Sequence, residues 1–390
     1  MKPYSAPDFF DIDAHLTEDE RMVRDSMRQF VSKEIVPIID DHFMKDSFPK
    51  HLVPMLGEMG TFGSTIHGYG CAGLNYTSYG IIMQELERGD SGLRSFVSVQ
   101  GALCMHPINA FGTEEHKKKY LPKMAKGELI GCFGLTEPDF GSNPSGMITT
   151  AKKDGSNYVL NGSKMWITSG GIADLAIVWA KVPDDNNKIH GFIVDRDSKG
   201  FSTRDIHKKF SLRASVTSEL IFEDCRVPAS NMLNVTGLKG PFSCLNNARY
   251  GISWGALGAA QACYDEALNY AKTRIQFDKP IASFQLVQAK LVDMFTEITK
   301  GQLLALHLGR MKDQDKATPQ HISMVKMNNV SQALRISRIA RDILGASGIT
   351  HEYQVGRHMM NLESVNTYEG TEDIHRLILG EHITGIPAYK

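Results

Sequence analysis

The segment NTYEGTEDIH gathers three carboxylates and a histidine around one glycine. Gly370 directly after Glu369 indicates a turn with close backbone approach. A carboxylate presented from such a turn, beside the aromatic Tyr368, can be partly desolvated, which raises its pKa and suits it to act as a base. Glu372 and Asp373 are instead typical of the first turn of a helix, where acids favour the helix dipole. Glu369 is therefore the predicted proton acceptor.

Two further segments combine hydroxyls, glycines and an aromatic ring. In CFGLTEPDFGSNPSG, Thr136, Gly141 and Ser142 offer close backbone approach and hydrogen bonds to a ligand, although a rigid inter-domain loop would look the same. In SKMWITSGG, the pair Trp166 and Thr168 suits a planar heterocycle, which the ring would cover and the hydroxyl would bond at its edge. The alternative for this segment is a strand with a core tryptophan.

Three regions must position these segments. Residues 1–128 show helical periodicity, residues 129–238 show short apolar runs between turn signals, and residues 239–390 are helical again. The middle region predicts a compact antiparallel β domain, in which Asn161-Gly162 forms a hairpin turn and residues 184–187 form a loop.

Individual helices can be predicted from the spacing of apolar residues. The segment LTEDERMVRDSMRQFVSKEIVPII predicts one amphipathic helix over residues 16–39, with Thr17 and Glu20 as a capping box at its start. Later helices are expected over about residues 318–345 and 353–362.

Composition excludes several classes of protein. The 390 residues are 42% hydrophobic and 22% charged with a formal net charge of -1, which is ordinary for a globular protein and unlike a basic nucleic-acid binder. The sequence contains no run of 18 apolar residues, so no membrane span is predicted. The N-terminal segment lacks a signal or transit character, and six cysteines are scattered without a C-x-x-C pair. These features predict a cytoplasmic protein.

Two motifs in the sequence are expected to carry no chemistry. GYGCAG spells a literal G-x-G-x-x-G, but TFGSTIH before it is a poor strand, so a plain loop between helices is predicted. His351, His358 and His375 do not share the i, i+4 spacing of a helical zinc site, so packing or surface roles and no metal are predicted.

Together, FGLTEPDFGS, KMWITSGG, TRIQFDKPIASFQ, RDILGASGI and YEGTEDIH resemble the acyl-CoA dehydrogenase family, over essentially the whole chain. Within the family the resemblance is greatest to the glutaryl-CoA dehydrogenase branch, through ELERGDSGLRSFVSVQ, KFSLRASVTSE and GPFSCLNNARYGISWGALGA. The resemblance implies an α+β fold with an N-terminal helical domain, a middle β-barrel and a C-terminal four-helix bundle. It also implies a homotetramer.

The resemblance implies FAD as cofactor. The positions that match those around the flavin and its pyrophosphate are Phe133, Leu135, Thr136, Gly141, Ser142, Trp166, Ile167, Thr168 and Ser169. The positions that match those on the adenine half, contributed by a neighbouring subunit, are Arg274, Phe277, Gln285, Asp342, Leu344 and Gly345. Thr371 and Asp373 would close over the cofactor.

The resemblance also places the acyl-CoA substrate and its chemistry. The positions that would hold the thioester are Ser142, Phe242, Leu245, Asn246, Arg249 and Gly370. Glu369 falls on the position of the catalytic base. In the family, a flavin ribityl hydroxyl and the backbone N–H of the base polarise the thioester carbonyl, and the β-carbon passes a hydride to flavin N5.

Glu87 and Arg94 are seven residues apart, two turns on one face if a single helix continues between them. They could form a structural ion pair, or Arg94 could clamp the distal carboxylate of glutaryl-CoA with Ser95 and Ser98 beside it. The match to the decarboxylating branch, which extends to Tyr368, favours the clamp. It predicts FAD-dependent oxidation of glutaryl-CoA to crotonyl-CoA and carbon dioxide.

One alternative from the sequence is a short-chain acyl-CoA dehydrogenase or oxidase without decarboxylation. Another is a DNA-binding flavoprotein, but the near-neutral net charge argues against it. An electron-transfer flavoprotein is expected as acceptor through the resemblance alone. Four positions depart from the usual pattern: Asp278 and Ala346 where glycine is common, Asn143 where aspartate is common, and Gly101 where serine is common in the branch.

Overall fold

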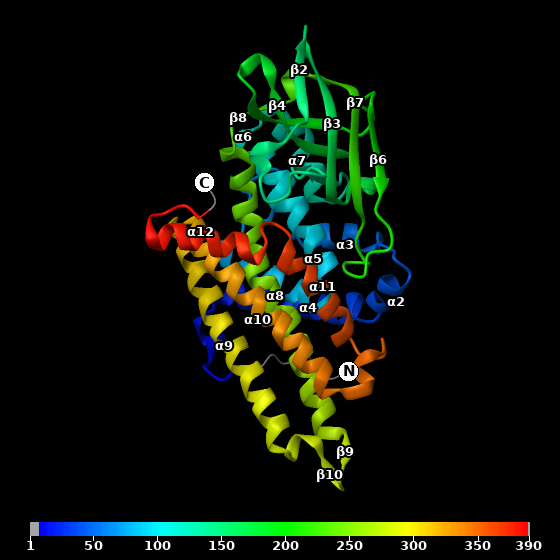
Figure 1. Cartoon of the computed structure of the whole chain (residues 1–390), viewed down its shortest axis with the longest axis vertical. Helices are drawn as coiled ribbons and strands as arrows, with labels where there is room; N and C mark the ends of the chain where they lie inside the picture. The colour runs from blue at the N-terminus through cyan, green and yellow to red at the C-terminus, as the bar shows by residue number, and fades with distance from the viewer. Residues whose placement is uncertain (1–7, 389–390) are drawn as a thin grey trace.

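The computed structural model describes residues 8–388; residues 1–7, part of the segment searched for targeting signals, lie outside it. The sheet region lies at the top of Figure 1, and long helices extend below it, with the N-terminal helices packed against them. The architecture is helical, sheet, helical in chain order, as predicted. The domain boundaries drawn above stay predictions.

Short helices form the N-terminal region. They are α1 (Glu18–Phe30), α2 (Ile39–Met44), α3 (Leu52–Glu58), α4 (Tyr76–Gly89), α5 (Ser91–Ser98), α6 (His106–Phe111) and α7 (Glu114–Ala125). The predicted capping box is confirmed, because Thr17 accepts a hydrogen bond from the Glu20 N–H and Glu20 accepts one from the Thr17 N–H. The helix expected over residues 16–39 is confirmed in its first part as α1, but it ends earlier than expected. A π-helical turn follows α1 and ends just before Pro37, whose missing N–H cannot continue the ladder.

The chain breaks between Glu87 and Arg94 instead of continuing as one helix. Asp90 is extended, with φ of -165°, and its side chain accepts a hydrogen bond from the Gly92 N–H as the N-cap of α5. Its other oxygen accepts hydrogen bonds from Arg357 and Asn361 on α11 (Val355–Thr367), which hold the break in place. The condition of one continuous helix between Glu87 and Arg94 is therefore not met, because a buried capping aspartate ends α4.

Eight strands form the middle sheet: β1 (Gly131–Gly134), β2 (Thr150–Asp154), β3 (Asn157–Thr168), β4 (Leu175–Val182), β5 (Lys188–Asp195), β6 (Phe201–Asp205), β7 (Thr217–Pro228) and β8 (Met232–Thr236). Their order is β6-β7-β3-β2-β4-β5-β8, with β1 on β4. The sheet is mixed, since β1 and β2 both pair with β4 in parallel. The expectation of an antiparallel sheet holds for the other pairs only.

The two turns predicted in this sheet have different outcomes. The loop over residues 184–187 is confirmed, with Asn186 and Asn187 in left-handed conformation between β4 and β5. The hairpin at Asn161-Gly162 is wrong, because Gly162 lies inside β3 at a register shift, where a Cβ would meet Thr149 Oγ1 at 2.6 Å. The turn from β2 to β3 falls at Gly155 instead.

The C-terminal region consists of long helices joined by a short two-stranded hairpin. Its elements are α8 (Lys239–Thr273), β9 (Ile275–Gln276), β10 (Lys279–Pro280), α9 (Gln285–Asp313), α10 (Pro319–Ile343), α11 and α12 (Glu372–Thr384). The helices expected near 318–345 and 353–362 correspond to α10 and α11. Figure 1 shows the hairpin at the end of the molecule farthest from the sheet.

Helix α4 packs closely along α8 because glycines line the contact. A Cβ on Gly251 would lie 2.6 Å from the Tyr79 hydroxyl, and one on Gly258 would lie 1.8 Å from the Gln84 carbonyl oxygen. Glycines at this spacing on one helix face let the two backbones approach. This contact brings α8 against the segment that carries Glu87.

Among residues 8–388, no helix is long and apolar enough to cross a membrane. The same residues include no group of three or more His, Cys, Asp or Glu side chains arranged to hold a metal ion. His358 and His375 are buried in the helical packing, and the GYGCAG segment is a loop without a preceding strand.

Candidate active site

A tight turn joins α11 to α12 and carries Glu369. Glu369 and Gly370 are both left-handed, with φ of 53° and 97°. This conformation costs a residue with a side chain about 1–2 kcal/mol, so the surroundings must hold it. Thr371 then caps α12 by accepting a hydrogen bond from the Ile374 N–H. The turn therefore presents Glu369 from a fixed backbone.

The carboxyl group of Glu369 lies among three cationic side chains. Its Oε2 atom is buried and has no hydrogen-bond partner within the described chain, although the residue as a whole keeps some exposed surface. Burial raises its pKa, against the opposing effect of the charges on Arg94, Arg249 and Lys326. A desolvated carboxylate with raised pKa is suited to accept a proton near neutral pH.

Arg94 is fully buried on α5 and ties the turn to α4. Its Nε donates to Glu87 Oε2 at 2.6 Å, and its Nη2 donates to the Tyr368 hydroxyl. The Ser95 hydroxyl lies 3.1 Å from the same Tyr368 oxygen. Burial opposes the charge of Arg94, but the adjacent Glu87 outweighs it, so the pKa of Arg94 lies above its usual value. The guanidinium therefore stays charged.

Several polar atoms around this arginine have no hydrogen-bond partner among residues 8–388. They include Arg94 Nη1, Glu87 Oε1, the Ser98 hydroxyl and Glu369 Oε2. Buried polar groups are normally paired, and an unmade hydrogen bond there costs about 1–3 kcal/mol. Because donors and acceptors gather in one place, the cluster is suited to receive a polar ligand group.

Helix α8 closes the far side of the Glu87–Arg94 pair. A Cβ on Gly255 would lie 2.1 Å from Glu87 Oε2 and 3.1 Å from Arg94 Nε. Only a glycine leaves room for the carboxylate at this point of α8. Gly255 was not among the residues predicted for the site.

Four of the predicted thioester positions lie in the first part of α8, whereas Ser142 lies in the FGLTEPDFGS loop and Gly370 in the Glu369 turn. Phe242 is exposed, Asn246 is half-buried, and Leu245 is buried. Arg249 reaches the turn, where its Nε donates to the Glu369 carbonyl oxygen at 2.6 Å. Of this set, Arg249 is the residue whose hydrogen bond joins α8 to the Glu369 turn.

Trp166 lies in an irregularity of β3. The register with β7 shifts between Lys164 and Ile167, and Trp166 has a φ of 64°. Its ring is 61% exposed, so the alternative of a core tryptophan is wrong. The bulge turns the ring to the surface while Ile167 points into the core and Thr168 is half-buried. Ser169 follows, buried and left-handed.

The FGLTEPDFGS loop runs beside this bulge. Phe133 and Leu135 are buried, whereas Thr136 is half-buried and Gly141 and Ser142 are exposed. The Met165 N–H donates to the Thr136 carbonyl oxygen at 2.9 Å and joins the loop to β3.

A buried ion pair that was not predicted from the sequence supports this loop. Lys164 Nζ donates to Glu137 Oε1 at 2.8 Å and to the Leu135 carbonyl oxygen at 3.1 Å. Glu137 also accepts hydrogen bonds from the N–H groups of Ile148 and Thr149. Burial lowers the pKa of Lys164 to about 8, although Glu137 opposes the shift.

The residues assigned to the adenine half lie away from Trp166 within one chain. Arg274 and Phe277 belong to the hairpin at the opposite end of the molecule from the sheet (Figure 1), and Phe277 is 86% exposed. Gln285 and Gly345 are exposed too, Leu344 is buried, and Asp342 pairs with Lys290. One chain therefore does not bring the two halves together. Their union across subunits stays a prediction.

Three of the departures from the family pattern can be placed. Asp278 has a φ of 63°, a left-handed conformation that aspartate tolerates better than most residues, whereas Ala346 has no positive φ. A Cβ on Gly101 would lie 3.0 Å from the backbone nitrogen of Gly63, which leaves no free space for serine without a shift.

Lys326 and His375 are buried beside the turn and were not predicted as site residues. Lys326 is fully buried on α10, between Val325 and Asn329 on the packed face of that helix. A lysine at a position that the helical spacing places on the buried face is the signal in the sequence that could have identified it. Burial, with Lys326 and Arg249 nearby, lowers the pKa of His375 to about 3, so this histidine is neutral.

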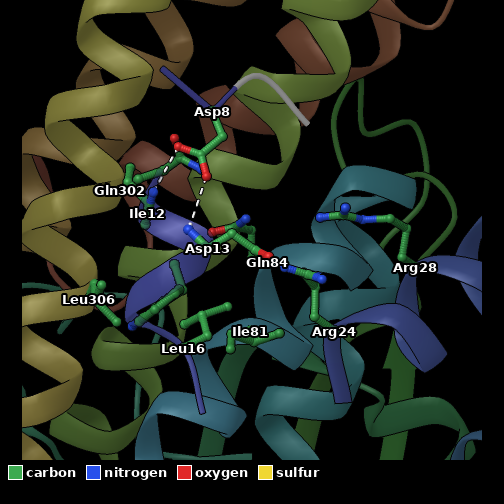
Figure 2. A pocket seen from close by; sticks show the side chains of 11 residues that line it. Asp8, Ile12, Asp13, Leu16, Arg24, Arg28, Ile81, Gln84, Gln302 and Leu306 are labelled. Atoms are coloured by element: carbon green, nitrogen blue, oxygen red, sulfur yellow. Dashed lines mark hydrogen bonds and ion pairs between the residues drawn. The ribbon is translucent and has the colours of Figure 1, made fainter. Parts of the chain in front are cut away.

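A cavity of about 260 Å³ lies elsewhere, between the N-terminal segment and helices α1, α4, α8 and α9. In Figure 2 the Asp8 carboxylate points to the backbone of Ile12 and Asp13, whose N–H groups donate to it at 2.9 Å and 3.0 Å. None of the Glu369 and Arg94 cluster lines this cavity. It is therefore separate from the candidate site.

Comparison with known proteins agrees with this arrangement. Models of the acyl-CoA dehydrogenase N-terminal, middle and C-terminal domains match residues 17–128, 132–225 and 236–384. The chain therefore belongs to the acyl-CoA dehydrogenase family.

Individual relatives differ in the substrate that their names give. A crystal structure of a glutaryl-CoA dehydrogenase from Mycobacterium smegmatis in complex with FADH2 is 51% identical, with a TM-score of 0.96 over 98% of each chain. An acyl-CoA dehydrogenase of Bacillus subtilis is 35% identical over 95% of this chain and 99% of its own length. The human mitochondrial short-chain specific acyl-CoA dehydrogenase is 35% identical over 94% of this chain and 90% of its own.

Proposed function

We propose that this chain is an FAD-dependent dehydrogenase that oxidises glutaryl-CoA and decarboxylates the product to crotonyl-CoA. The observation that carries the proposal is the fully buried Arg94, which has an unpartnered Nη1 and is linked through Tyr368 to the Glu369 turn. A buried guanidinium with a free donor is suited to a carboxylate, which can accept paired hydrogen bonds from it. The identity to the Mycobacterium smegmatis enzyme supports this choice of substrate.

Glu369 removes the α-proton in this proposal. The α-proton of a thioester is weakly acidic, so the carbonyl must be polarised while the proton leaves. The backbone N–H of Glu369 supplies one of the hydrogen bonds to the thioester carbonyl. The raised pKa of Glu369, caused by its burial, makes it a stronger base than an exposed carboxylate.

The surface beside β3 fits a planar cofactor. The exposed Trp166 ring can cover one face of a heterocycle, and Thr168 beside it can donate to the ring edge. A Cβ on Gly141 would meet nothing within 4 Å, so the loop leaves open space for a ligand against its backbone. When bound there, FAD supplies the acceptor for the hydride from the β-carbon. The chain supplies the base, the alignment and the exclusion of water.

The distal carboxylate explains the second step. Arg94 holds this carboxylate during oxidation, which creates a double bond between the α- and β-carbons. The carboxylate then leaves as carbon dioxide, and the electron pair of the broken bond is delocalised to the thioester carbonyl. Glu369, protonated in the first step, returns a proton to the γ-carbon and gives crotonyl-CoA.

Product analysis tests the proposal. Purified holoenzyme is mixed anaerobically with glutaryl-CoA and an artificial electron acceptor, and the acyl-CoA products are identified by mass. Crotonyl-CoA with carbon dioxide is expected. Glutaconyl-CoA as the final product would contradict the proposed decarboxylation step. Turnover of butyryl-CoA alone would contradict glutaryl-CoA as the substrate.

The assignment of Glu369 has its own test. Glu369→Gln should keep the fold, the cofactor and acyl-CoA binding but lose proton abstraction, because the amide cannot accept the proton. Glu372→Gln is the matched control, since Glu372 pairs with Arg376 on the first turn of α12. Rapid substrate oxidation by Glu369→Gln with loss in Glu372→Gln would reverse the assignment.

The second candidate is a short-chain acyl-CoA dehydrogenase or oxidase that takes an uncharged acyl group. The identity to short-chain relatives favours it. It gives Arg94 a structural role as the partner of Glu87. Comparing glutaryl-CoA with butyryl-CoA as substrate separates the two candidates.

We also propose that the chain assembles with itself, as a homotetramer. Ile275, Phe277, Leu286 and Val292 expose large apolar side chains along the hairpin and α9. A row of exposed apolar residues of this size is typical of an interaction surface. Sedimentation of the purified protein tests the assembly, and a monomer at micromolar concentration would contradict it. Electron-transfer flavoprotein as acceptor and cytoplasmic location stay predictions.

A further inference from the structure

Three successive backbone carbonyls of the Glu369 turn point to two buried cations. Lys326 Nζ, from α10, donates to the carbonyl oxygens of Tyr368 and Gly370 at 3.2 Å and 2.8 Å. Arg249 Nε, from α8, donates to the Glu369 carbonyl oxygen at 2.6 Å. Lys326 therefore bridges the two carbonyls on either side of the one that Arg249 holds.

The hydrogen bond to Tyr368 fixes the direction of the Glu369 N–H. The Tyr368 carbonyl and the Glu369 N–H belong to one peptide unit, which is trans, as are all peptide bonds of the described chain. In a planar trans peptide the N–H points opposite to the C=O. When the carbonyl points at the Lys326 ammonium, the N–H must point away from it. Lys326 thus sets the direction of the donor that the proposed mechanism uses.

The left-handed turn needs this support. Glu369 and Gly370 have φ of 53° and 97°, a region that a glutamate adopts only when its surroundings hold it. A hydrogen bond from a charged donor is stronger than one between neutral groups, and it opposes the conformational cost of one left-handed residue. Both hydrogen bonds from Lys326 therefore favour this conformation of the turn.

Charged groups from α5, α8, α12 and the Glu369 turn surround the Lys326 ammonium. Burial lowers its pKa to about 7, while Glu369 and Glu372 raise it and Arg249 and Arg94 lower it further. The neighbouring His375 is neutral, because burial holds its pKa near 3. The positive charge of Lys326 in turn favours the ionised form of Glu369.

We propose that Lys326 is a positioning residue for proton abstraction, which holds the 368–369 peptide so that the Glu369 N–H and carboxylate face the thioester together. This inference rests on the proposed function, in which Glu369 is the base. Lys326 acts through the turn and does not itself touch the substrate.

The test is Lys326→Met, which keeps the length of the buried stem and removes the charge and both hydrogen bonds. The readout is exchange of the α-protons of 3-thiaglutaryl-CoA with deuterated water, because sulfur at the β-position leaves no β-hydride to transfer. Exchange at saturation should slow about 10- to 100-fold, as expected for a misplacement of about 1 Å. Affinity for the analogue should change less than about threefold, since no contact with it is removed.

The pH profile adds a readout that a merely structural role would not change. Without the positive charge, the midpoint of the exchange rate should move upward by about one pH unit. Lys326→Gln, which keeps a donor without the charge, should recover part of the rate at the shifted midpoint. If Lys326→Met does not fold, Lys326→Gln replaces it and is judged by the same criteria.

Lys209→Met is the matched control. Lys209 is also a lysine with a pKa lowered by burial, and its Nζ donates to the Ser215 carbonyl oxygen at 2.8 Å, in another loop. An unchanged exchange rate and midpoint in Lys326→Met, or equal loss in Lys209→Met, would overturn the inference. If Glu369→Gln also exchanges at the wild-type rate, the proposed base is wrong. If α-proton exchange is lost in Glu369→Gln but keeps the wild-type rate in the folded Lys326 variants, this inference is wrong and the proposed base still stands.

Discussion

Replacing Arg94 by methionine should separate glutaryl-CoA from an uncharged substrate. Methionine keeps much of the volume of the buried stem but removes the unpartnered Nη1 that would bind the distal carboxylate. Glutaryl-CoA would then bring a carboxylate into a buried site without a counter-charge. Butyryl-CoA has no carboxylate and loses no such contact.

The size of the effect follows from the burial of the pair. Truncating one partner of a buried, hydrogen-bonded charge pair costs about 2–5 kcal/mol. Since about 1.4 kcal/mol corresponds to a factor of ten, kcat/KM for glutaryl-CoA should fall about 30- to 4,000-fold. With butyryl-CoA the loss should be smaller once Glu87 is also neutral, because no substrate charge is involved and only the effect of Arg94 on Tyr368 and Glu369 remains.

Glu87 requires a matched control variant. It accepts a hydrogen bond from Arg94 Nε at 2.6 Å, and both side chains are fully buried. Removing Arg94 alone leaves an unpaired buried carboxylate and should lower the free energy of unfolding by about 3–5 kcal/mol. The double variant Glu87→Gln/Arg94→Met removes both charges and should recover part of that stability.

The assay measures kcat/KM for glutaryl-CoA and butyryl-CoA at one pH with an artificial acceptor, for wild type, Arg94→Met and the double variant. Cofactor content and thermal unfolding are recorded for each, so that a loss of fold is seen separately. Equal losses on both substrates in the double variant would refute the carboxylate clamp. Arg94 would then be a structural ion-pair partner.

Three further predictions concern the base, the helix contact and the assembly. Because burial raises the pKa of Glu369 in the folded state, its contribution to stability is present below the unfolded pKa and lost as pH rises through the folded pKa. The free energy of unfolding from denaturant titrations should show this decrease with rising pH in wild type and not in Glu369→Gln. Gly255→Ala should destabilise the fold by about 1–3 kcal/mol and displace Glu87, since the new Cβ would lie 2.1 Å from its Oε2; calorimetry with kinetics on glutaryl-CoA checks both effects. Phe277→Glu should lower the sedimentation coefficient by placing charge on the apolar surface, and an unchanged coefficient would exclude that surface as an interface.

Much of the architecture follows from local sequence signals. The change from helical periodicity to short apolar runs and back predicts the three regions, and the Thr17–Glu20 capping box is found as expected. Such features depend on hydrogen bonds and side-chain spacing within a few residues, which the sequence contains directly. The order of elements could therefore be predicted without a structure.

Features that depend on partners distant in the chain could not be predicted in this way. Asp90 ends α4 because Arg357 and Asn361 bind its side chain from α11, more than 260 residues later. Gly162 lies inside a strand, where it pairs with Phe222 of β7 and Thr149 approaches its backbone. Rules based on neighbouring residues, such as the dipeptide rule for hairpins, include neither contact, and tertiary packing overrides them.

By itself, the sequence indicated the family and the tight turn around Gly370, and it predicts Glu369 as the base ahead of its neighbouring acids. The tertiary structure decided which charges face that carboxylate. Arg94, Arg249 and Lys326 come from three helices, and their convergence, together with burial, sets the pKa and the backbone direction of Glu369. Electrostatic effects depend on distance and desolvation in space, and neither quantity can be read from separation along the chain.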